Sequence, residues 1–153
     1  MSTTRHGSVH AEPGIGGAAR AWATTDRAAR LSLLWIFALM NYLYCDVLGL
    51  TDANILKDLI NGTGPVSMTQ GFLLGSAIVM EIPIAMVLLS VVLPFTPSRW
   101  ASIAAGATMT LVQVASLFVG GGPTIYYAFF SAIEIAATAF IVWYAWTWHR
   151  ADS

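Results

Sequence analysis

Charge is scarce in this chain. Only 10% of its 153 residues are charged, and the formal net charge is -1 at neutral pH. Soluble domains carry about 25% charged residues. The composition therefore argues against an ordinary soluble domain and indicates a membrane protein.

The residues that build disulfides and metal sites are also few. Cys45 is the single cysteine, so no intrachain disulfide can form, and we interpret it as a small buried apolar group. The three histidines lie in the terminal segments, and no zinc-like spacing, nucleotide-binding loop or nucleophile–base pair occurs. We expect no metal, no cofactor and no nucleic-acid partner, and soluble catalysis is a poor interpretation.

Apolar sequence is abundant, since 57% of the residues are hydrophobic. Four stretches of about 20 residues can each cross a hydrocarbon core of roughly 30 Å as a helix. They cover residues 31–50, 71–93, 100–119 and 124–148. We predict an all-α fold, an antiparallel bundle of four transmembrane helices, with a mobile cytoplasmic tail over residues 1–30 and a short tail over 149–153.

The basic residues orient this bundle. Six of the seven Lys and Arg residues fall on one side of the predicted spans, and Lys57 alone falls on the other. Because cytoplasmic loops carry an excess of Lys and Arg, both termini are predicted to be cytoplasmic. Five tryptophans support the same orientation, because they fall near the predicted cytoplasmic interface, where an indole can bury its ring and keep its N–H in water. They are Trp35, Trp100, Trp143, Trp146 and Trp148.

The first outer loop contains a predicted short amphipathic helix, residues 52–60. Thr51 can cap its start and Gly62 can end it. Such a helix either lies flat on the outer surface of the membrane or covers the bundle as a lid.

Acidic residues, but no basic ones, lie within the four stretches. An ionisable group at bilayer depth costs about 2.5 to 3.5 kcal/mol, so it usually faces a bundle interior and serves a pathway or a ligand. One large polar side chain lies about 10 to 15 Å from the outer end of each stretch; these are Asn41, Glu81, Gln113 and Glu134. We predict that they form one polar layer, in which at least one Glu is protonated because no basic residue is near. Asp46 lies closer to the outer surface, as an entrance group or an interfacial carboxylate.

Helical spacing groups further polar residues with this layer. One stripe contains Tyr127, Ser131, Glu134 and Thr138, and another contains Gly106, Thr110, Gln113 and Ser116. Pro83 is predicted to kink its helix and to free the carbonyl oxygen of Val79 beside Glu81. The candidate ligand- or proton-binding residues are Glu81, Glu134, Asn41, Gln113, Asp46, Tyr42, Ser131 and Thr138.

Small residues recur at helix-packing distances in two places. Gly71 and Gly75 form a Gly-x-x-x-Gly pattern, and Ser102, Gly106 and Thr110 form a ladder. Either can seat another helix closely, within the chain or in a second copy of it.

Several runs resemble those of a family of short bacterial four-helix membrane proteins known only as a domain of unknown function. They are Leu34–Asp46, Thr69–Gly75, Met80–Ser90 and Ile133–Tyr144. The resemblance covers residues 31–148, implies a bacterial inner membrane and carries no activity or site residues. In architecture the chain is also similar to DoxX-like proteins and to small multidrug transporters, although the motifs of both families are missing.

Three functions fit these patterns. The first is a small proton- or cation-coupled carrier, or a small-molecule- or lipid-binding protein, in which Glu81 and Glu134 exchange a proton or cation for a ligand from the outer side. The second is a structural or accessory subunit of a membrane complex, in which the polar layer only fixes helix packing. The third is an intramembrane enzyme on a lipid-like substrate, with one Glu as general acid. The expected partners are the lipid bilayer, a small-molecule or lipid ligand and a second copy of the chain.

Overall fold

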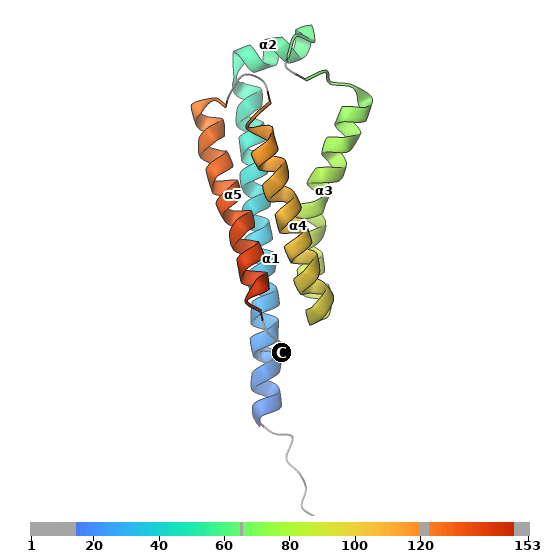
Figure 1. Ribbon diagram of the computed structural model, residues 1–153, viewed down its shortest axis with the longest axis vertical. Helices are drawn as coiled ribbons and strands as arrows, with labels where there is room; N and C mark the ends of the chain where they lie inside the picture. The colour runs from blue at the N-terminus through green and yellow to red at the C-terminus, as the bar shows by residue number, and fades with distance from the viewer. Residues whose placement is uncertain (1–14, 65, 120–122, 149–153) are drawn as a thin grey trace, which may run out of the picture.

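The fold consists of helices, as predicted. The computed structural model describes residues 15–64, 66–119 and 123–148, with side chains from residue 26 onward. Its helices are α1 (Ile15–Thr51), α2 (Ala53–Asn61), α3 (Gln70–Val92), α4 (Phe95–Ser116) and α5 (Ile125–Trp146) (Figure 1).

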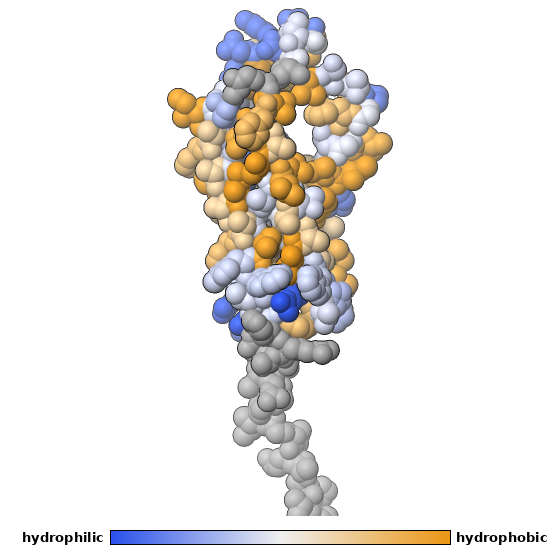
Figure 2. Space-filling model, in the orientation of Figure 1, coloured by the Kyte–Doolittle hydropathy of each residue, from blue (hydrophilic) through white to orange (hydrophobic). Residues whose placement is uncertain are grey.

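Three of these helices are long and apolar enough to cross a membrane. They are the segment Asp26–Thr51 of α1, and the whole of α3 and α5. The helix α4 is of similar length, but Arg99, Gln113 and several hydroxyl side chains make it less apolar. Hydrophobic residues cover much of the visible surface of the long helices, with polar residues towards both ends (Figure 2). These features indicate a membrane protein.

Two helices begin earlier than the sequence pattern predicts. The helix α1 starts at Ile15, so residues 15–30, predicted to be part of a tail, are helical. The remaining tail residues, 1–14 and 149–153, lie outside the described residues. The helix α4 starts at Phe95 rather than at Trp100 and includes Pro97 in its first turn. Proline is tolerated there, because the N–H groups of the first turn have no partner within the helix.

The short helix α2 is close to its predicted range, but its cap differs. The Asp52 carboxylate, and not the Thr51 hydroxyl, accepts a hydrogen bond from the backbone N–H of Asn54, at 2.9 Å. The Thr51 hydroxyl donates to the carbonyl oxygen of Leu48, at 2.7 Å. Gly62 ends α2 as predicted: its φ of 66° is in the left-handed region, which glycine adopts without a Cβ penalty.

The four long helices form a ring. Both α3 and α5 pack against α1 and α4. The core lies towards the end of the bundle away from α2, with Trp35 of α1, Met86 of α3, Met109 of α4 and Ile141 of α5 all buried. Towards α2, α3 diverges from the other helices (Figure 1), and none of its residues before Pro83 is buried.

A close contact between α4 and α5 lies at Gly106. A Cβ atom added to this glycine would lie 2.7 Å from Cγ2 of Val142 and 3.2 Å from the carbonyl oxygen of Thr138. The small-residue ladder of α4 therefore seats a helix of the same chain. Around Gly75 of α3, by contrast, an added Cβ would meet nothing within 4 Å.

The five tryptophans predicted to lie at the membrane interface divide into two groups. Trp100, Trp143 and Trp146 are 55–58% exposed. Trp35 and Trp148 are buried, and their indole nitrogens have no hydrogen-bond partner. The expectation that all five place a wet N–H at the membrane interface is wrong for these two, which fill the core instead.

Candidate functional site

The two predicted polar stripes of α4 and α5 face each other inside the bundle. The side-chain amide of Gln113 donates to the hydroxyl of Ser131, at 2.8 Å, and the hydroxyls of Thr110 and Thr138 are 2.8 Å apart. Ser131 and Thr138 are 1% and 0% exposed. We call these four residues, together with Glu134, the polar seam.

Glu134 is the member of the polar seam without a satisfied side chain. It is 1% exposed, and its Oε1 is buried with no hydrogen-bond partner. It lies within electrostatic range of Tyr42, Cys45 and Asp46 on α1. The Tyr42 hydroxyl is likewise buried without a partner. Buried polar groups are nearly always hydrogen-bonded. Trp35, Arg99, Ser102 and Trp148 also have a buried polar atom without a partner, but Glu134 and Tyr42 are distinguished because these two unsatisfied groups interact electrostatically with each other.

Two predicted members of the interior layer lie elsewhere. Glu81 is exposed on α3, and Asn41 is half-buried and donates to the carbonyl oxygen of Phe37 in its own helix, at 2.8 Å. The prediction of one inward layer supplied by all four helices is therefore wrong for Glu81, and Asn41 takes no part in the polar seam. The physical reason for Glu81 is that α3 is apolar on every side, so its sequence pattern does not reveal which face is buried.

Asp46 is exposed on α1 one turn from Tyr42 and next to Cys45, which is buried. Its carboxylate is an electrostatic neighbour of Glu134. Among the residues that the structure describes, no three His, Cys, Asp or Glu side chains are grouped as metal ligands would be.

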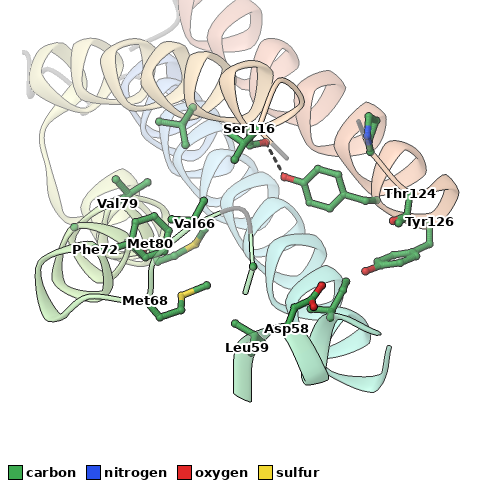
Figure 3. A pocket seen from close by; sticks show the side chains of 18 residues that line it. Asp58, Leu59, Val66, Met68, Phe72, Val79, Met80, Ser116, Thr124 and Tyr126 are labelled. Atoms are coloured by element: carbon green, nitrogen blue, oxygen red, sulfur yellow. Dashed lines mark hydrogen bonds between the residues drawn. The ribbon is translucent and has the colours of Figure 1, made fainter. Parts of the chain in front are cut away.

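A cavity of about 920 Å³ lies beneath α2, between α3 and the neighbouring ends of α4 and α5 (Figures 2 and 3). Most side chains around it are apolar. Its lining includes Ile55, Leu59, Val66, Met68, Phe72, Gly75, Ser76, Val79, Met80, Val112, Ser116, Tyr126 and Tyr127. The sequence pattern did not reveal this cavity, because its lining comes from separate segments whose apolar residues look like ordinary membrane-facing residues.

The polar seam reaches the cavity through two hydroxyls. Tyr127 and Ser116 both line the cavity, and the Tyr127 hydroxyl donates to Oγ of Ser116, at 2.7 Å (Figure 3). The Ser116 hydroxyl donates to the carbonyl oxygen of Gln113, at 2.7 Å, and Gln113 in turn bonds Ser131. Polar groups thus extend from the cavity to Ser131, one helical turn from Glu134, although Gln113 bonds Ser116 through its backbone carbonyl and Ser131 through its side-chain amide.

Pro83 marks the border between the packed and open parts of α3. It is buried, and Val79 and Met80, about one turn earlier, line the cavity. Proline has no N–H, so the Val79 carbonyl oxygen receives no hydrogen bond from this position of the helix.

The short helix α2 covers this cavity. Ile55 and Leu59 on one face of α2 line it, together with Asp58, whose carboxylate accepts a hydrogen bond from the Thr63 hydroxyl at 3.0 Å.

Fold and site together define an all-α protein with three helices long and apolar enough to span a membrane, a buried polar seam and an apolar cavity beside it. The chain belongs to a protein family of unknown function (DUF6326), whose model matches residues 20–153. This agrees with the resemblance to an uncharacterised family. No curated protein and no solved structure matches the chain.

Proposed function

We propose that this protein is a four-helix protein of the cell membrane that binds a lipid-like small molecule in the cavity beneath α2. The helix α4 packs between α3 and α5, so we infer that it crosses the membrane with its neighbours. The asymmetry of basic residues supports cytoplasmic termini, and in that orientation α2 and the cavity face the outer side.

The observation that carries this proposal is the size and chemistry of the cavity. Its volume of about 920 Å³ falls in the range of small-molecule sites, which are mostly apolar with a few polar groups that orient the ligand. An alkyl or isoprenoid chain fits the wall formed by Phe72, Val79 and Met80. The hydroxyls of Ser116 and Tyr127 suit a polar head group that accepts or donates hydrogen bonds.

A matched pair of variants on α3 tests this site. Ser76 lines the cavity, whereas Ala77 is exposed and does not. Ser76→Phe places a phenyl ring inside the cavity, and Ala77→Phe adds a similar volume on the lipid side of the same helix. The probe is a diazirine-labelled fatty acid, cross-linked in membranes and mapped by mass spectrometry.

We expect saturable labelling of cavity residues in the natural chain and in Ala77→Phe, and at least a tenfold loss in Ser76→Phe, because the phenyl ring occupies the space of the ligand. Unsaturable labelling, or equal labelling in both variants, would contradict the proposal. Circular dichroism of both variants provides the control for folding.

Proton-coupled transport of this ligand is a second candidate, favoured by the unsatisfied carboxyl of Glu134 next to the polar seam. A protonated carboxyl can donate a hydrogen bond and release the proton when the ligand moves. In liposomes, flux of the labelled fatty acid should then depend on a pH gradient, and Glu134→Gln should abolish that dependence while cavity labelling persists. Gradient-independent flux in the natural chain would favour a binding protein or an accessory subunit instead.

A further inference from the structure

Glu81 lies on the membrane-facing side of α3, midway along the helix. Residues 70–80 precede it and residues 82–92 follow it within α3. At 1.5 Å per residue, it lies about 16 Å from either end of the helix. A Glu side chain is too short to reach the membrane interface from there. The Glu81 carboxyl therefore stays near the middle of the membrane, on the side of α3 that faces away from the bundle.

The residues around Glu81 form a regular stripe along this side of α3. Exposed and half-buried residues recur at alternating spacings of three and four, the heptad pattern by which two helices pack side by side. We call this set the outer face of α3: Gly71, Leu74, Ile78, Glu81, Ala85, Leu88 and Val92. Its large apolar side chains are 61–66% exposed, whereas Phe72, Leu73, Ile84 and Val91 on other sides of α3 are 41–57% exposed.

The outer face of α3 points away from both the core and the cavity. Residues two positions apart on a helix differ by about 200° in direction, so Glu81 lies nearly opposite Val79 and Pro83, which face the cavity and the core. Gly71, the first residue of the Gly-x-x-x-Gly pair, also lies on this side. A Cβ atom added to Gly71 would make no close contact with another helix. The packing within one chain thus leaves the outer face of α3 largely uncovered.

We propose that two copies of the chain associate through the outer face of α3, with the two Glu81 carboxyls hydrogen-bonded to each other across the dimer axis. Two copies inserted in the same direction are related by a two-fold axis along the membrane normal, which brings each residue of this face opposite its own counterpart. Glu81 then meets Glu81 at the same depth. A protonated carboxyl both donates and accepts hydrogen bonds, so this pairing is self-complementary.

A second copy is favoured over a basic partner by the composition of the chain itself. A carboxyl facing lipid costs about 2.5 to 3.5 kcal/mol at the bilayer centre, and pairing relieves that cost. The pair needs no group that the chain lacks, because two protonated carboxyls each donate to the other and accept from it, and the pair is then uncharged. The dimer also leaves the cavity beneath α2 open, since that lies on the opposite side of α3.

Cysteine cross-linking of the full chain in native membranes tests the dimer, in a Cys45→Ala background. Leu74→Cys and Leu88→Cys place thiols on the outer face of α3. Leu73→Cys and Val91→Cys are matched controls on the same helix, 47% and 57% exposed but about 100° away from the middle of that face. After oxidation, we expect disulfide-linked homodimers at the two outer-face positions and at most a tenth as much at the controls.

Substitution of Glu81 tests the role of the carboxyl in that dimer. Glu81→Leu should lower the dimerisation constant about 3- to 30-fold, the range expected for lost hydrogen bonds between membrane helices. Glu81→Gln should preserve it, because two amides also pair with each other. Equal cross-linking at outer-face and control positions, a cross-linked product that contains another protein, or unchanged dimerisation in Glu81→Leu would each overturn the proposal.

Discussion

Replacing Glu134 by methionine should not destabilise the protein. Glu134 is 1% exposed and its Oε1 has no hydrogen-bond partner, so the carboxyl is desolvated without full compensation. Leaving a buried polar group unsatisfied costs about 1–3 kcal/mol. Methionine has a similar length and no polar hydrogen-bonding requirement, so the free energy of unfolding should stay the same or rise by up to that amount.

A neighbouring variant provides the contrast. Ser131→Ala removes the acceptor of the 2.8 Å hydrogen bond from Gln113, which is itself 6% exposed. It should lower the free energy of unfolding by about 1–3 kcal/mol, because the buried amide is left unpaired. The two variants therefore differ in sign although both lie in the polar seam.

Unfolding by sodium dodecyl sulfate from mild detergent micelles, followed by far-ultraviolet circular dichroism, measures both changes. If Glu134→Met lowered the free energy of unfolding by more than about 1 kcal/mol, the carboxyl would be part of the hydrogen-bond network that holds the helices. Glu134 would then be explained by its contribution to stability, and its role in a proton-coupled function would lose its support.

Two further predictions concern packing and topology. Gly106→Ala should destabilise the protein by about 1–3 kcal/mol, since its Cβ would lie 2.7 Å from Cγ2 of Val142, whereas Gly75→Ala should cause no loss; equal thermal unfolding of the two variants would contradict this. Thr63, just after α2, and Thr96, in the first turn of α4, are both exposed and lie on the segments before and after α3. In a background without the native cysteine, a membrane-impermeant maleimide should modify Thr63→Cys in intact cells and Thr96→Cys only after permeabilisation, and the reverse pattern would show that the orientation is inverted.

Much of the helical structure follows from local sequence. The predicted spans 71–93 and 124–148 differ by at most two residues at either end from α3 and α5, because both are long apolar runs between turn-forming residues. The stripe on α5 and its counterpart on α4 were also predictable, since polar residues spaced three and four apart mark one face of a helix. Gly62 could be recognised as a helix end from its conformational freedom alone.

The direction of Glu81 required the tertiary structure. A lone polar residue in a helix that is apolar on all sides does not identify the buried face, because apolar side chains suit both lipid and core. Only the packing of α3 on α1 and α4 shows that Glu81 faces outward. The same ambiguity explains the wrong prediction for Trp35, which lies in the core although its position in the sequence suited the membrane interface.

Hydropathy and helical period, both properties of the sequence, are enough to specify the membrane-protein class, the helices and the pairing of polar faces on α4 and α5. The packing of the helices decided that Glu134 is buried and Glu81 is exposed, and that α2 and α3 enclose a cavity with α4 and α5. Those features depend on how far apart packed helices lie, which hydropathy does not encode.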